Sequence, residues 1–253
     1  MRYTTGLVLA TFGTLAVASA AQAAYLPIAV SGFGNDVILA STDSYSTGLT
    51  ATMDDGTGKT GNTFYEAGYV ATGGLPAGGL IVSAVDAGHT FQLQSYTANN
   101  ALMIAIPFDS YGAHTTNQPI GTLTVNQPAS YSALSFLVAS GSGAGAVGYT
   151  INYAAGAAAT GTLAVPNWGD VAAGMAVKSG RANSSGFDNA DYGMFQVDVT
   201  GLTNTSAITS IDFVNDSLMG NKTIFAVSGA VPEPTSMAVL GLGGLSLLAR
   251  RRR

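Results

Sequence analysis

Side chains able to perform catalysis are scarce in this sequence of 253 residues. There are two histidines, His89 and His114, and no cysteine, which excludes thiolate catalysis, disulfides and cysteine metal sites. Serine and aspartate are common enough for a Ser-His-Asp triad, but the G-x-S-x-G string of a nucleophile elbow does not occur. We therefore expect no enzymatic activity, and we interpret each histidine as a surface or hydrogen-bonded residue in a loop or strand end.

Carboxylates could support glycoside hydrolysis only if two of them faced each other at a set separation. Glu66 is the only glutamate before Glu233, and the aspartates are dispersed along the chain. The sequence pairs none of them, so Glu66 is interpreted as a solvated charge at a strand edge, and a secreted hydrolase is the third choice of function.

Two aspartate-containing segments offer oxygen ligands beside turn residues, as calcium requires. They are Asp54-Asp55-Gly56-Thr57-Gly58 and Asp188-Asn189-Ala190-Asp191. Neither matches the twelve-residue calcium loop with its closing glutamate, and such stretches are usually ordinary turns. No cofactor is therefore expected, and Asp54, Asp55, Asp188 and Asp191 are weak calcium candidates.

Aromatic side chains could bind glycans, because the apolar face of a sugar stacks on a ring. Trp168 is the best candidate, since it lies beside Asn167 and Asp170. Four tyrosines are weaker candidates: Tyr65, Tyr96, Tyr111 and Tyr192. The alternative for the single tryptophan is a plug at one end of the protein core.

Short β-rich runs separated by Gly, Asn, Asp and Pro must position these residues, since no long stretch keeps a helical rhythm. Alternating apolar and polar residues predict strands with one buried face at Val147–Tyr153, Phe195–Val199 and Ile211–Phe213. Further strands are expected at Ile28–Ser31, Val37–Ala40, Leu80–Val85, Phe91–Gln94, Ala101–Ile106, Gly121–Val125, Ala133–Ala139, Gly161–Val165 and Ile224–Val227.

The predicted fold class is all-β, with a single jelly-roll-like β-sandwich. The low-complexity stretch Ser140–Gly148 is interpreted as a flexible connection between two strands, and Ser228-Gly229-Ala230 as a short linker after the sandwich. From residue 24 to 229 the chain has 13 acidic and 4 basic residues, a net charge of −9. This charge repels phosphate backbones, so we exclude nucleic-acid binding.

The first residues have the pattern of a secretory signal peptide. Arg2 precedes an apolar stretch from Leu7 to Ala18, and Ala21-Gln22-Ala23 is an A-x-A cleavage pattern that makes Ala24 the expected mature start. The protein would therefore use the general secretion machinery and signal peptidase.

Three features follow one another at the other end. Val231, Pro232, Glu233 and Pro234 should be extended and accessible, because the prolines fix φ and remove two donors. The uncharged run Met237–Ala249 follows and is expected to form a single transmembrane helix. Arg250, Arg251, Arg252 and Arg253 should remain cytoplasmic by the positive-inside rule, which places the preceding chain across the membrane.

This tail resembles the PEP-CTERM sorting signal, in which a Pro-Glu-Pro motif, an apolar helix and a terminal arginine cluster occur in this order. The resemblance implies that an exosortase-like membrane protease and transpeptidase recognises Pro232, Glu233 and Pro234. These residues would then be a recognition motif for another protein. The alternative is a simple C-terminal membrane anchor.

A second resemblance covers most of the body. Strings such as F-G-N-D-V-I at Phe33–Ile38, V-P-N-W at Val165–Trp168 and I-F-A-V-S-G at Ile224–Gly229 look like the sandwich domains that often precede PEP-CTERM tails. Those domains are in turn similar to carbohydrate-binding jelly rolls. This resemblance supports the fold more than any ligand.

The expected organisation is a signal peptide at 1–23, a β-sandwich at 24–229 and a sorting tail at 230–253. We expect a non-enzymatic protein that is exported, anchored in the inner membrane as an intermediate, and released to the cell surface or an extracellular polysaccharide matrix. A secreted carbohydrate-binding module is the alternative function.

Overall fold

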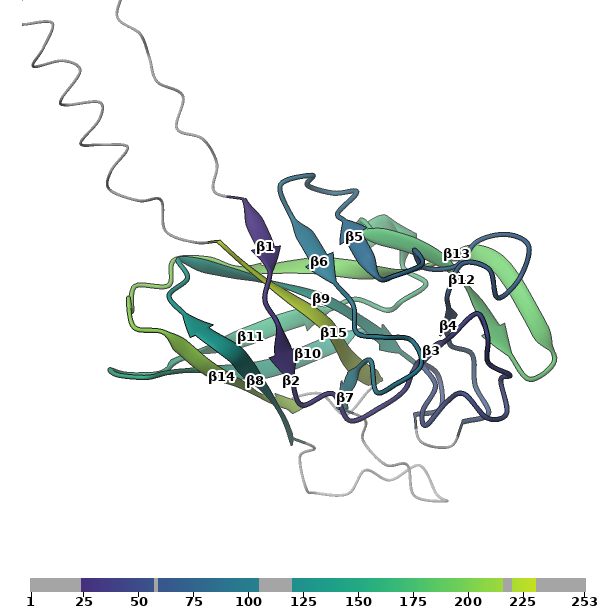
Figure 1. The fold of residues 1–253 in the computed structure, drawn as a ribbon, viewed down its shortest axis with the longest axis horizontal. Coiled ribbons are helices and arrows are strands. Elements are labelled where there is room, and N and C mark those ends of the chain that lie inside the picture. The colour runs from purple at the N-terminus through teal and green to yellow at the C-terminus, as the bar shows by residue number, and fades with distance from the viewer. Residues whose placement is uncertain (1–23, 57–58, 105–119, 216–219, 231–253) are drawn as a thin grey trace, which may run out of the picture.

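The computed structural model describes residues 24–56, 59–104, 120–215 and 220–230, and over these residues the protein is all-β (Figure 1). The predicted signal peptide, the residues from Val231 onward, Tyr111 and His114 lie outside them. No helix in the described segments is long and apolar enough to cross a membrane. The elements are β1 (Tyr25–Pro27), β2 (Val30–Ser31), β3 (Ile38–Leu39), β4 (Phe64–Tyr65), β5 (Leu80–Val82), β6 (Thr90–Gln92), β7 (Leu102–Ile104), β8 (Ile120–Ala129), β9 (Ala133–Gly141), β10 (Gly145–Tyr153), β11 (Ala159–Val165), the 3₁₀ turn η1 (Val171–Ala173), β12 (Val177–Asn183), β13 (Gly186–Val199), β14 (Ile208–Asn215) and β15 (Asn221–Ala230).

Two curled sheets form the β-sandwich. The six-stranded sheet has the order β1-β15-β9-β13-β12, with β7 also paired to β15, and the five-stranded sheet has the order β11-β10-β14-β8-β2. Two small sheets, β3-β4 and β5-β6, complete the described fold. Figure 1 shows β6 between β1 and β5, and Thr90 of β6 contacts Ser228 of β15 in the six-stranded sheet.

The strand pairs alternate between the two large sheets along the chain. β7 pairs with β15 and β9 with β13 in the six-stranded sheet, whereas β8 pairs with β14 and β10 with β11 in the five-stranded sheet. All four pairs are antiparallel. The chain therefore passes from one sheet to the other several times, and contacts distant in sequence dominate the fold.

The different sequence patterns of the two sheets follow from what covers them. β9 and β15 are buried at every position, because their sheet is covered on both faces and tolerates continuous apolar runs. On the outer face, Ser228 Oγ of β15 donates to the carbonyl of Thr90, and Phe225 contacts Phe64 edge-on. In β8, Leu123 and Val125 are buried while Thr122 is exposed, which is the alternation of a sheet with one wet face.

Aromatic rings join the sheets in the core. Phe136 of β9 and Phe213 of β14 meet edge-to-face, with ring centroids 5.8 Å apart. Both side chains are at most 1% exposed. Their contact bridges the six-stranded and five-stranded sheets at the centre of the sandwich.

Each predicted strand overlaps an observed one, but some elements were missed. The sequence patterns do not predict β1, β4, η1 or β12, and they predict only the last five residues of β13. β1 and β4 are too short to show a period. β12 has the sequence VKSGRAN, in which polar and small residues conceal the strand, and its pairing with β13 stabilises it.

The interpretation of Ser140–Gly148 as a flexible connection was wrong. β9 continues to Gly141 and β10 begins at Gly145, so the turn has only three residues, Ser142 to Ala144. Gly141 is needed because a Cβ there would collide with the carbonyl oxygen of Met53. Gly141 therefore reflects close packing of backbones and not a flexible connection.

The interpretation of Ser228-Gly229-Ala230 as a linker was also wrong. These residues form the last part of β15 and pair with β9 on one side and β1 on the other. The sheet interior admits only small side chains here, since a Cβ on Gly229 would collide with Tyr131. The sandwich therefore extends to residue 230, one residue beyond the predicted boundary.

Candidate functional site

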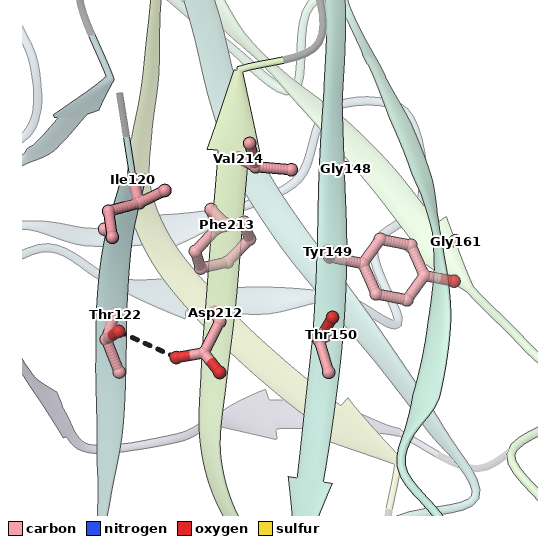
Figure 2. Close-up of a pocket in the computed structure, with 10 residues that line it drawn as sticks. Ile120, Thr122, Gly148, Tyr149, Thr150, Gly161, Asp212, Phe213 and Val214 are labelled. Atoms are coloured by element: carbon pink, nitrogen blue, oxygen red, sulfur yellow. Dashed lines mark hydrogen bonds between the residues drawn. The ribbon is translucent and has the colours of Figure 1, made fainter. Parts of the chain in front are cut away.

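The outer face of the five-stranded sheet carries a trough of about 480 Å³ (Figure 2). We call it the sheet trough. It runs across β8, β14, β10 and β11, because side chains on this wet face are short. Its lining residues are Ile120, Gly121, Thr122, Gly148, Tyr149, Thr150, Gly161, Asp212, Phe213 and Val214.

Strand register places one carboxylate at the centre of the trough. Asp212 of β14 lies opposite Thr122 of β8 and Thr150 of β10. Thr122 Oγ1 donates to Asp212 Oδ1 at 2.7 Å, the contact drawn in Figure 2, and Asn152 Nδ2 donates to Asp212 Oδ2 at 2.7 Å. Two donors from neighbouring strands thus fix the carboxylate, which keeps acceptor capacity for a ligand.

One glycine deepens the trough. Gly148 lies between Val214 and Thr162 across the strands and adds no side chain to the face. Tyr149 projects from the opposite face, because it is the register partner of the buried Phe213; its ring extends from β10 toward β11 (Figure 2), and a Cβ on Gly161 would collide with it.

The electrostatics of the trough favour a neutral ligand with hydroxyl groups. Its lining has one carboxylate and no basic side chain, so it would repel anions and accept hydrogen bonds from hydroxyls. Ile120 and Val214 add an apolar rim, and Ile120 is 81% exposed. In the sequence, Asp212 stands out only as the polar residue between Ile211 and Phe213. A lone carboxylate on the wet face of a strand was the available signal.

Trp168 lies in the core. Its side chain is 2% exposed and packs edge-on against Phe64, with centroids 5.1 Å apart, and against Tyr192 at 4.7 Å. A sugar cannot reach either face of this ring in the folded protein, so its placement fits the alternative of a core plug. Among the weaker candidates, Tyr65 and Tyr96 are buried, and Tyr192 lies between Trp168 and the guanidinium of Arg181.

His89 lies at a strand end, directly before β6, as expected, but it is buried and not at the surface. It is 2% exposed and stacks on Tyr25 with centroids 3.8 Å apart. Its Nδ1 lies 3.1 Å from Asp86 Oδ2 and its Nε2 lies 3.5 Å from Asp198 Oδ1. Ser135 Oγ donates to Asp198 at 2.5 Å. The buried serine thus contacts a carboxylate and not the imidazole, so these residues do not form a Ser-His-Asp triad.

The calcium candidates are engaged with protein groups. Asp54 accepts from Asn62 Nδ2 at 2.7 Å, and Asp55 accepts from Thr60 Oγ1 at 2.6 Å. Asp188 and Asp191 lie in strand β13, so the expectation that they belong to a turn was wrong. Asp188 forms an ion pair with Arg181, and Asp191 forms one with Lys178. In the described part of the chain, no three His, Cys, Asp or Glu side chains converge as a metal site would require. Glu66 Oε2 accepts from the backbone N–H of Ser41 at 2.8 Å.

The comparison with protein families identifies the tail. Residues 230–253 match the family described as PEP-CTERM protein-sorting motif. The chain carries a PEP-CTERM motif. This confirms the resemblance inferred from the Pro-Glu-Pro string, the apolar run and the arginine cluster. The PEP-CTERM motif implies an exported protein that an exosortase sorts.

Other comparisons add little to the PEP-CTERM assignment. No curated protein matches the sequence. A solved structure of an exo-beta-agarase is similar with a TM-score of 0.27 and 13% sequence identity, over 66% of this chain and 25% of that chain. The match thus spans about a quarter of the agarase chain, and similarity at this level carries no argument about function.

Proposed function

We propose that this protein is a non-enzymatic component of the cell surface or extracellular matrix, delivered there by its two terminal segments. The observation that carries the proposal is the PEP-CTERM motif, which begins at residue 230, where the last core strand ends. The organisation is a signal peptide at 1–23, a sandwich from 24 to 230, and a sorting tail whose matched motif also begins at residue 230.

Export would proceed in two steps. Signal peptidase cuts after Ala23, and the general secretion machinery moves the body across the inner membrane. The run Met237–Ala249 then holds the intermediate in the membrane, with Arg250 to Arg253 on the cytoplasmic side. An exosortase-like protease recognises Pro232, Glu233 and Pro234 and releases the body.

We infer that the body is a jelly roll. Four antiparallel pairs, β7 with β15, β8 with β14, β9 with β13 and β10 with β11, alternate between the two sheets. A long hairpin rolled into two facing sheets produces this alternation, and the jelly roll has that topology.

Mass spectrometry of the mature protein tests the sorting proposal. Protein recovered from the producing cell should begin at Ala24 and lack the arginine cluster. Replacing Pro232, Glu233 and Pro234 together by alanine should leave the tail attached and the protein in the membrane fraction. Wild-type protein found in the cytosol with Arg253 still attached would contradict the proposal.

A second candidate function is polysaccharide binding at the sheet trough, favoured by the fixed carboxylate of Asp212 among threonine hydroxyls. A glycan array followed by titration calorimetry would test it. Asp212→Ala should weaken binding to a captured glycan about ten- to a hundredfold, because a charged hydrogen bond contributes about 1.5–3 kcal/mol. Asp191→Ala, which removes an exposed carboxylate on β13, should bind normally. The absence of binding to any neutral glycan would exclude this function.

A further inference from the structure

The segment that joins the body to the PEP-CTERM motif is a paired strand end. Ser228, Gly229 and Ala230 are buried and lie between β9 and β1. The carbonyl of Ala230 also accepts from Ser132 N at 2.9 Å. Only Val231 separates this strand from Pro232.

A protease that cuts near Val231–Pro234 must bind the residues before its cut in an extended form. Such binding commonly adds the substrate as a strand and uses the main-chain groups along one free edge. At Ser228 to Ala230 one edge is taken by β9, whose pairing with β15 continues back to Asn221 and has nine residue pairs in all. The other edge is taken by β1, over three residue pairs.

β1 is the weaker of these two partners. It is a strand of three residues that begins one residue after the expected mature N-terminus, and short terminal strands open at low free-energy cost. Its attachment is concentrated at Tyr25. Tyr25 N donates to Gly88 O at 2.9 Å, Thr90 Oγ1 donates to Tyr25 O at 3.0 Å, and the ring stacks on His89.

We propose that β1 is a cover strand over the edge of β15 that the sorting protease needs, and that β1 must leave this edge before the tail is cut. This inference rests on the proposed sorting function. The interaction surface is the edge of Ser228, Gly229 and Ala230, and its partner is the substrate cleft of an exosortase-like protease. Docked β1 slows cutting, and released β1 permits it.

A disulfide between β1 and β15 tests the proposal. Ile28 N donates to Val227 O at 2.9 Å, so by antiparallel alternation Tyr25 and Ala230 form a non-hydrogen-bonded pair. The Cα atoms of such pairs lie about 4.5 Å apart, within the range of a disulfide. Tyr25→Cys with Ala230→Cys therefore locks β1 in place, and the natural chain has no cysteine that could compete.

Loss of the tail is followed in the producing cells by pulse-chase and intact mass, with a mild oxidant or a reductant added. The oxidised variant should lose its tail about tenfold more slowly than the same variant reduced, because the cover can no longer open. The control disulfide, Ala146→Cys with Ala164→Cys, joins β10 and β11 in the other large sheet and should have no effect.

Leu26→Pro is the second variant. It removes a main-chain donor that β1 gives to Gly229 and should speed tail loss at least twofold. The inference would be overturned if the oxidised, locked variant lost its tail as fast as the same variant under reducing conditions. Wild-type protein that keeps its tail would instead overturn the sorting function itself, so the two failures are distinguishable.

Discussion

Single buried polar residues hold the irregular segments of this sandwich. Asn100 is fully buried, and its Oδ1 accepts from the backbone N–H groups of Val37 and Ile38 at 3.0 and 3.1 Å. Its Nδ2 donates to Asp36 Oδ1 at 2.6 Å. One side chain thus satisfies backbone groups at the start of β3, which a buried loop could not leave unpaired.

The buried carboxyl of Asp36 makes stability depend on pH. Burial, the largest cause, raises its pKa from 3.8 to about 7, although the hydrogen bond from Asn100 opposes the rise. The folded protein therefore binds this proton more tightly than the unfolded chain. The resulting stabilisation is complete below about pH 4 and is lost as the pH rises through about 7.

We therefore expect the melting temperature to fall between pH 5 and pH 8. Asp36→Asn should remove this part of the dependence, since the amide stays neutral and Asn100 can still donate to it. Thermal melts of both proteins across this range check the prediction, and parallel pH profiles would contradict it.

His89 is expected to stabilise the protein more than an exposed ion pair does. Its buried ring contacts Tyr25 and separates the carboxylates of Asp86 and Asp198, although neither nitrogen makes a hydrogen bond of good geometry. His89→Ala should lower the free energy of unfolding by about 1–3 kcal/mol in urea titrations. Lys178→Ala, which breaks an exposed pair with Asp191, should cost less than about 1 kcal/mol. Equal effects would show that His89 is not a packing residue.

At the scale of elements, strand ends and turns are set by close backbone approach. β9 reaches Gly141 because this position has no side chain and Met53 packs directly over it. The same principle applies at Gly229 in β15, where Tyr131 occupies the space of a Cβ. Glycine in this protein therefore marks packed sheet interiors as well as turns.

Gly141→Ala is expected to destabilise the fold strongly. The added methyl would overlap the carbonyl of Met53, which is backbone and cannot rotate away, so the cost should be about 2–4 kcal/mol. Gly34→Ala is the matched control, because no atom lies within 4 Å of a Cβ built there. Denaturant midpoints of the two variants measure the difference. A mild effect at Gly141 would mean that the β9–β10 turn is adaptable.

At the scale of the whole molecule, the sandwich brings both processing regions to one edge of one sheet. Tyr25 is the register partner of Ala230, so the expected mature start and the beginning of the PEP-CTERM motif are neighbours. Figure 1 shows β1 alongside β15 at this edge. Signal peptidase and the sorting protease would therefore act on the same end of the body.

Global stability should depend on the aromatic contact between the sheets. Phe136→Ala removes a fully buried ring that meets Phe213 across the core, and we expect a loss of about 3–5 kcal/mol. Phe187→Ala, at a ring that is 50% exposed, should change stability little. Calorimetric melts of the two variants measure this difference in stability. Similar losses of stability in the two variants would show that the contact between Phe136 and Phe213 is not central to the core.

The sequence by itself determined the properties that depend on residues adjacent in the chain. The PEP-CTERM motif is a contiguous string, and alternation along β8, β10 and β14 reports a sheet with one wet face, so the tail and the all-β class were both predictable. Only the tertiary structure decided which distant residues meet. Asp212 receives donors from Thr122 and Asn152, 90 and 60 residues away, because strand register aligns them.

Burial at the strand ends also required the fold. Ser228-Gly229-Ala230 has the composition of a linker, yet it is buried because β1 and β9 take up its backbone groups. Likewise, Trp168 and His89 are buried because other segments of the chain pack over them, and the sequence around each residue does not predict this burial. Strand pairing and packing depend on residues that are distant in the sequence, so composition alone cannot distinguish a strand end from a linker.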